Sequence, residues 1–135
     1  MRAFLIISLF VAFAASGCSG KRSSAVPVQE GIPEIAFREY EHHFGKVKEG
    51  EKVSYQFTFD NKGPGDLVLT SVSTTCGCTV PKYDVKPISQ GESGRIEVVF
   101  DTSGRDGMQT KTITVKSNAS KPIVLLKITA DVESN

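Results

Sequence analysis

Apolar and polar residues alternate along this chain most clearly at residues 53–60. Val53, Tyr55, Phe57 and Phe59 are separated there by polar neighbours. Successive side chains of a β-strand point to opposite faces, so a period of two indicates a strand with one buried and one exposed face. The segment is therefore predicted to be a half-buried strand with an aromatic inner face.

Other short segments have the same character and are separated by loops rich in Gly, Pro, Asn and Asp. Further strands are predicted at 34–37, 44–47, 67–72, 95–101, 110–116 and 123–132, with at best an edge strand at 82–88, where Pro87 interrupts the chain. No apolar period of 3.6 residues follows the N-terminal segment. About seven strands in roughly 100 residues favour an all-β fold. We expect an Ig-like antiparallel β-sandwich over residues 32–135, without the Trp of antibody domains.

The first 17 residues differ from the rest in composition. A positive start is followed by an apolar run at 3–15, which is shorter than the roughly 20 residues that a membrane-spanning helix needs. This pattern is typical of a cleaved helical signal peptide. Ala15-Ser16-Gly17-Cys18 resembles the bacterial lipobox, although Ala15 stands where Leu is commonest. The resemblance implies cleavage before Cys18 and acylation of Cys18, palmitate included; the alternative is an ordinary signal peptide followed by an incidental cysteine.

Residues 18–31 are small, polar and Pro-bearing, which predicts a flexible, lipidated tether. Fully extended, it reaches about 43 Å at roughly 3.3 Å per residue. Two or three acyl chains give stable membrane attachment where one is marginal. We expect a membrane-anchored protein of the bacterial cell envelope. In a bacterium with two membranes, Ser19 after the cysteine resembles cargo of the outer membrane, facing the periplasm.

The charge pattern excludes some functions. The formal net charge is only +1, and no basic stripe is present, so a nucleic-acid partner is not expected. No paired carboxylates, nucleophile elbow or dinucleotide-binding glycine motif is complete, and we expect no catalytic residues and no enzyme activity.

Cys76 and Cys78 are the candidate site, because two thiols one residue apart follow a predicted strand. In an extended strand their Cα atoms would lie about 6.6 Å apart, near the upper limit for a disulfide, and Gly77 could bring them closer with a positive φ. Three interpretations stay open: a structural or disulfide-closed turn, a redox pair, or a pair of thiolates for a soft ion such as Cu(I). Zinc lacks enough local ligands. His42 and His43 are interpreted as solvated polar residues.

Several motifs together resemble the DUF1573 family. They include residues 44–51 (FGKVKEGE), residues 57–63 (FTFDNKG) and residues 76–81 (CGCTVP), and the resemblance covers residues 37–132. Gln90 departs from the family pattern, in which Pro often stands there. The family is bacterial, frequently exported or lipidated, and of unknown function. It is similar in fold to the ASPM/SPD-2/Hydin modules, which are Ig-like and bind partners.

These observations predict a membrane-anchored lipoprotein carrying a non-catalytic binding or scaffolding module. Its expected partners are the membrane, through Cys18, and an envelope protein. The alternative is thiol-redox or Cu(I) handling at Cys76-Gly77-Cys78. Apart from the covalent lipid on Cys18 and the Cu(I) of this alternative, no cofactor is expected. Arg105, in a polar loop, is interpreted as a solvent-facing charge.

Overall fold

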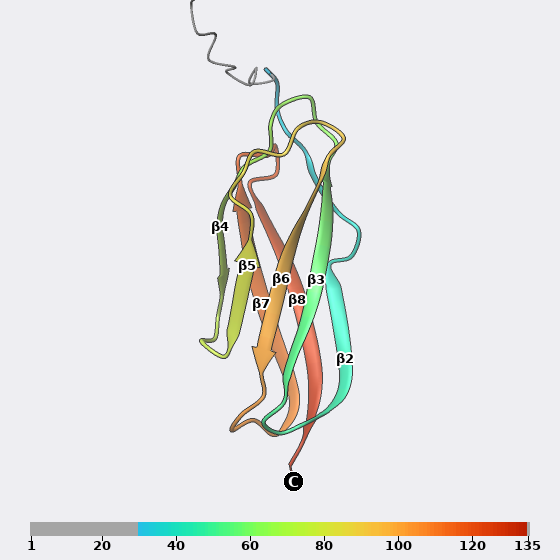
Figure 1. Cartoon of the computed structure of the whole chain (residues 1–135), viewed down its shortest axis with the longest axis vertical. Coiled ribbons are helices and arrows are strands. Elements are labelled where there is room, and N and C mark those ends of the chain that lie inside the picture. Colours follow the sequence, from blue (N-terminus) through green and yellow to red (C-terminus); the bar gives the residue numbers. More distant parts are fainter. Residues whose placement is uncertain (1–29, 135) are drawn as a thin grey trace, which may run out of the picture.

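The computed structural model describes residues 30–134 and consists of eight β-strands without a helix in that range (Figure 1). No helix in this part of the chain could therefore cross a membrane. The predicted signal peptide 1–17, the lipidation site Cys18 and all but the end of the tether 18–31 lie outside the described residues. The strands are β1 (Ile35–Phe37), β2 (Glu41–Lys48), β3 (Lys52–Asn61), β4 (Leu69–Thr74), β5 (Thr79–Tyr83), β6 (Ser93–Asp101), β7 (Gly107–Ser117) and β8 (Ile123–Glu133).

The strands form two four-stranded sheets that pack face to face. The first has the order β1-β3-β6-β5 and the second β2-β8-β7-β4. Figure 1 shows β4 and β5 together at one side of the sandwich and β2 at the other. The predicted all-β, Ig-like sandwich is confirmed, with eight strands in place of about seven.

The core lies between the sheets and follows from the period-two pattern. Phe57 and Phe59 of β3 are almost completely buried, as the alternation at 53–60 predicts. The rings of Phe37 and Phe59 pack with centroids 5.1 Å apart. The other large, fully buried apolar side chains are Leu67, Ile96, Val98, Phe100, Ile113, Val115, Leu126, Ile128 and Val132.

The prediction of a purely antiparallel sandwich is wrong for one pair of strands. β2 pairs with β8 in parallel and is eight residues long, whereas the sequence predicted a strand only at 44–47. The register shifts between His43 and Lys46, where Gly45 has a φ of 72°. A glycine adopts this left-handed conformation without steric cost and so permits the bulge. The parallel pairing joins residues about 85 positions apart, which no local pattern encodes.

The prediction of an edge strand at 82–88 is wrong in position. β5 is indeed at a sheet edge, but it comprises Thr79–Tyr83 and contains Pro81. Proline lacks an N–H group, and an edge strand tolerates this because one side of it has no partner. Similarly, the predicted strand 67–72 is divided: Leu67 forms an isolated bridge with Ile88, and β4 begins at Leu69.

Candidate functional site

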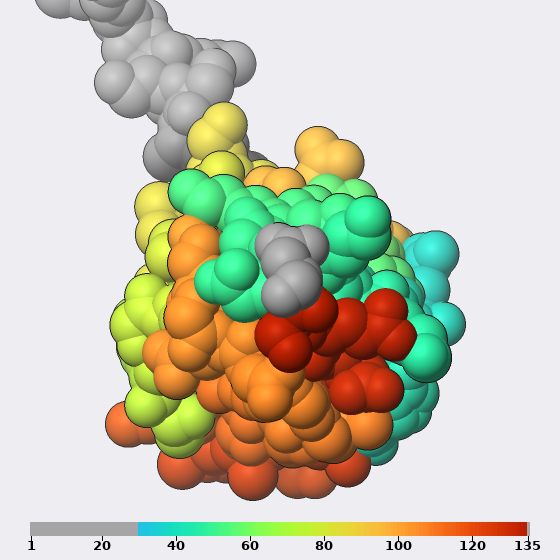
Figure 2. Space-filling view, turned by 90° about the horizontal axis from the view of Figure 1, so that it is seen from below, coloured from blue at the N-terminus to red at the C-terminus, as the bar shows by residue number. Residues whose placement is uncertain are grey.

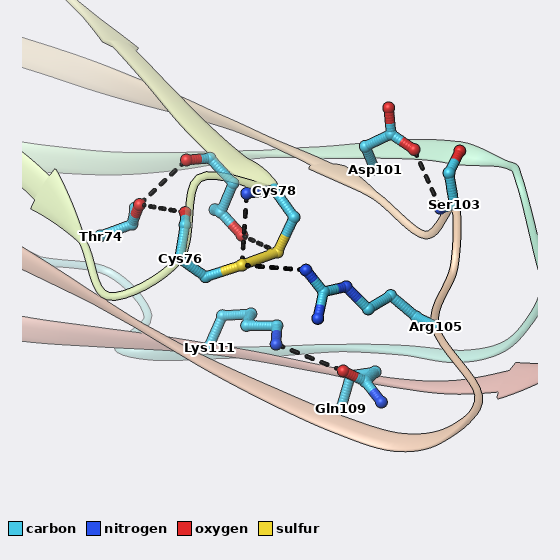
Figure 3. Close-up of a disulfide and its surroundings, with 9 residues drawn as sticks. Thr74, Cys76, Cys78, Asp101, Ser103, Arg105, Gln109 and Lys111 are labelled. Atoms are coloured by element: carbon cyan, nitrogen blue, oxygen red, sulfur yellow. Dashed lines mark hydrogen bonds between the residues drawn. A yellow bond between two sulfur atoms is a disulfide. The ribbon is translucent and has the colours of Figure 1, made fainter.

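The turn between β4 and β5 carries Cys76 and Cys78, which form a disulfide in the structure (Figure 3). Their Cα atoms lie 5.3 Å apart, closer than the 6.6 Å expected for an extended segment. The chain achieves this by leaving the strand conformation after Thr74, and Gly77 does not have a positive φ. Both cysteines are half-buried.

Hydrogen bonds within the turn hold the two sulfur atoms in place. The Thr74 hydroxyl is 2.9 Å from the carbonyl oxygens of both Cys76 and Thr79, so it ties the end of β4 to the start of β5. The amide of Thr79 donates to the Cys76 carbonyl at 3.2 Å, and the amide of Cys78 donates to Cys76 Sγ at 3.2 Å. Asp101 N donates to the Cys78 carbonyl and fixes the turn to β6.

A cationic group lies on one side of the disulfide. Arg105, in the loop between β6 and β7, places Nη2 3.7 Å from Cys76 Sγ (Figure 3). The Nε atom of Arg105 is buried and has no hydrogen-bond partner among the described residues. Lys111 of β7 lies nearby: burial lowers the pKa of its ammonium group, and the positive charge of Arg105 lowers it further.

The other side of the turn opens onto a shallow pocket of about 330 Å³. Cys78 lines this pocket together with Gly77, Val80 and Val99, and Cys76 does not. Val80 is about half exposed, at 52%. Figure 2 shows the yellow-green β4–β5 segment at the molecular surface beside the orange β6–β7 segment. Cys78 is therefore the half of the disulfide that borders this surface pocket.

The disulfide closes too short a loop to contribute much stability. In the chain-entropy model a closed loop of about three residues is worth about 1.6 kcal/mol, compared with about 3 kcal/mol for about 15 residues. The two cysteines are separated by only two positions in sequence. The small stability that the disulfide adds to the fold therefore does not by itself explain the presence of this bond.

The family model of DUF1573, described as a protein of unknown function, matches residues 35–132. The chain belongs to the DUF1573 family. The matched region contains all eight strands apart from the last residue of β8. No curated protein matches this DUF1573 chain significantly.

Solved structures with the same fold come from several sources. A protein of unknown function from Porphyromonas gingivalis W83 has 21% identity and a TM-score of 0.63, over 82% of this chain and 51% of that one. The PapD-like domain 7 of human CEP192 has 10% identity and a TM-score of 0.63, over 92% and 99%. The Vibrio cholerae VesB protease has 18% identity and a TM-score of 0.61, over 73% and 32%. The DUF1573 chain thus spans about half the length of the first of these, and identities this low show a shared fold alone.

Sequence reasoning missed the role of Arg105. It was interpreted as solvent-facing, but the structure places its half-buried guanidinium against Cys76. Nothing local in Gly104-Arg105-Asp106-Gly107 indicates this contact, because Cys76 is 29 residues away. Only the packing of the β6–β7 loop against the β4–β5 turn brings the two together.

The two histidines lie away from the disulfide. β2, which carries them, and β4 are opposite edges of the second sheet. His42 stacks on Tyr55 with ring centroids 3.6 Å apart, and burial lowers the pKa of its imidazole. His43 is exposed and hydrogen-bonds to Thr129. His42 is therefore a packed side chain rather than a solvated one.

Within residues 30–134 of the DUF1573 chain, no group of three or more His, Cys, Asp or Glu side chains is placed to hold a metal ion. In the disulfide neither sulfur is a thiolate, and thiolates are what a soft ion such as Cu(I) binds. Binding of Cu(I) stays a prediction, and it applies to the reduced pair.

Proposed function

We propose that this DUF1573 protein is a lipid-anchored, non-catalytic binding module of the bacterial cell envelope. The partner is an extended segment of another envelope protein, which adds as a strand to the free edge of β4. The resemblance of Ala15-Ser16-Gly17-Cys18 to a lipobox supports the anchor, and the Ig-like sandwich supports the binding role. The main observation in support of strand addition is the amino-acid composition of β4.

The free edge of β4 lacks the charges and prolines that usually oppose strand addition, and its one irregularity lies at its first residues, between Leu69 and Ser71. Its sequence, Leu-Thr-Ser-Val-Ser-Thr, contains no charge, Pro or Gly. Natural edge strands are commonly protected by charged side chains, proline, bulges or short length. β4 pairs only with β7, so the backbone groups on its other side face away from that ladder.

The remaining three edges of the sandwich are protected. β2 carries Lys46, Lys48 and the bulge at Gly45. β5 contains Pro81, and β1 has only three residues. Of the four strands that end the two described sheets, β4 is therefore the longest without a charge or a proline.

The lipid anchor is tested by fractionation. Mass spectrometry of the purified protein should find acyl chains on an N-terminal Cys18. Cys18→Ser should move the protein from the membrane to the soluble fraction. Cys76→Ser is the matched control and should stay in the membrane fraction. A Cys18→Ser protein that remains membrane-bound would contradict the anchor.

Strand addition is tested by site-specific photo-cross-linking in intact cells. A photoreactive residue at Thr70, which is exposed on β4, should give a discrete adduct. The same residue at Glu97, on β6 where it is paired with both β3 and β5, should not. Ser73→Lys should abolish the Thr70 adduct, because an edge lysine opposes strand pairing. Equal adducts at both positions, or an adduct insensitive to Ser73→Lys, would contradict the proposal.

A further inference from the structure

We propose that the Cys76–Cys78 bond is a thiol–disulfide exchange site, which reacts with a dithiol at Cys78 and releases Cys76 as the leaving thiolate. This role goes beyond strand binding and does not depend on it, since it concerns the sulfur atoms of the turn and not the β4 edge. It rests on the different surroundings of the two sulfurs (Figure 3).

Cys76 lies where a negative charge is stabilised. The Arg105 guanidinium already contacts Cys76 Sγ at 3.7 Å, and its buried Nε has a free donor. Lys111 adds a second cation close to Arg105. A thiolate next to cationic groups is favoured over the thiol, and a thiol that ionises readily is the better leaving group in exchange.

The charged groups on the pocket side largely cancel one another. Lys52 of β3 and Asp101 of β6 both line the pocket beside Cys78, and their Nζ and Oδ2 atoms are 3.5 Å apart. Cys78 therefore lacks the cationic surplus that surrounds Cys76. Cys78 lines the pocket and Cys76 does not, so Cys78 is the sulfur at which we expect a thiolate to attack.

The reaction balances with a dithiol as reductant. One thiolate of the dithiol attacks Cys78 Sγ, a mixed disulfide forms, and the Cys76–Cys78 bond breaks with its electron pair moving to Cys76. The second thiolate of the dithiol then attacks the first sulfur of the same dithiol, which is bonded to Cys78 in the mixed disulfide. This step closes the disulfide of the dithiol and releases Cys78. Two electrons pass to the turn, and the dithiol becomes a disulfide. One of its protons ends on Cys78, and the other goes to solvent while Cys76 stays ionised beside Arg105.

The first test measures reduction of the folded, full-length protein. Dithiothreitol and a reduced Cys-X-X-Cys protein are the two probes, and intact mass after alkylation counts the free thiols. Arg105→Gln should slow reduction about tenfold, because a hydrogen bond from a charged donor to the leaving thiolate is lost. Arg105→Lys should stay within about threefold of the wild type, since it keeps the charge. Arg95→Gln, an exposed substitution on β6, is the control and should change nothing.

The outcomes separate the two sources of dithiol. If the protein probe reduces the disulfide faster than dithiothreitol at equal concentration, the dithiol that reacts at the pocket is a protein. If only dithiothreitol reduces it, the dithiol is a small molecule. Reduction by neither probe while the protein remains folded would overturn the proposal. So would equal rates for wild type and Arg105→Gln, with circular dichroism confirming that both are folded.

The second test is a pH profile, which a purely structural bond would not affect. In Cys78→Ser only Cys76 remains in the turn, and its alkylation rate should reach half its maximum at least about one pH unit below that of Cys78 in Cys76→Ser. Arg105→Gln in the Cys78→Ser background should shift the Cys76 profile upward. Identical profiles for the two cysteines would overturn the assignment of Cys76 as the leaving group.

Discussion

Asn61 shows how one side chain organises the upper loops of the sandwich. It is completely buried, and it uses all four of its hydrogen-bonding positions. Its Nδ2 donates to the carbonyls of Gly65 and Ile88, and its Oδ1 accepts from the amides of Glu34 and Gly63. Three separate loop segments are thus joined through a single amide.

Replacing Asn61 should therefore be costly. Asn61→Ala leaves buried backbone groups without partners, and we expect a loss of about 3 kcal/mol in the free energy of unfolding, measured in urea. Asn118→Ala is the matched control: Asn118 is exposed, makes two such bonds, and should cost about 1 kcal/mol. Equal losses for the two variants would contradict this account of burial.

Asp60 should make the stability of the folded protein depend on pH in the acidic range. The hydrogen bond from Ser93, followed by that from Arg38, lowers the pKa of Asp60 to about 2. The unfolded value is about 3.9, so the resulting stability is fully present above about pH 4 and is lost as the pH falls towards 2.

The carboxyl signal of Asp60 in an NMR titration should therefore have its midpoint near pH 2. Ser93→Ala should move that midpoint upward, because the strongest stabilising hydrogen bond to the carboxylate is removed. Ser54→Ala, a distant exposed serine, should leave it unchanged. A midpoint that does not respond to Ser93→Ala would mean that Ser93 is not the cause.

At the scale of elements, the β4–β5 turn joins the two proposed roles. It connects the edge strands of the two sheets, and it also holds the disulfide. Hydrogen bonds from Thr74, Thr79 and Asp101 hold the turn independently of the sulfur bond. The turn is therefore expected to keep its shape when the disulfide opens.

Cys76→Ser/Cys78→Ser tests this directly. The double variant should remain folded and lose only about 1.6 kcal/mol, because the closed loop is so short. Denaturant unfolding of the variant and of the oxidised wild type gives the comparison. A loss above about 4 kcal/mol in the free energy of unfolding would identify the disulfide as a structural bond. It would contradict the argument that the bond contributes too little stability to be structural.

The whole molecule depends on one core shared by both sheets. Phe59 is fully buried, packs on Phe37 and lies over Gly94, where a Cβ atom would be 2.4 Å from the Phe59 ring. The sandwich has no smaller independent unit, because each sheet buries its inner face only against the other. Loss of one core residue should consequently weaken both sheets together.

Phe59→Ala should reduce the free energy of unfolding by about 3–5 kcal/mol. Phe44→Ala, at a half-buried position of β2, is the control and should cost clearly less. Far-ultraviolet circular dichroism and tyrosine fluorescence should report coincident unfolding transitions. Separate transitions for the two probes would show that the sheets unfold independently.

The alternation of side chains by itself determined the fold class and most strands. Residues 53–60 and 95–101 form β3 and β6 nearly as predicted, because a period of two is a local property of the chain. The same pattern placed the loops and identified Phe57 and Phe59 as core. The family motifs, lying in sequence order, indicated the DUF1573 family that the model match shows.

Tertiary structure alone decided which distant residues meet. The parallel pairing of β2 with β8, the free edge of β4 and the contact of Arg105 with Cys76 all join parts of the chain that are far apart in sequence. Such contacts follow from how two sheets and their loops pack, and no local period encodes them. The sequence therefore identified the Cys76–Cys78 pair. Only the packing of the β6–β7 loop gave its two sulfur atoms different surroundings, because it places Arg105 beside Cys76.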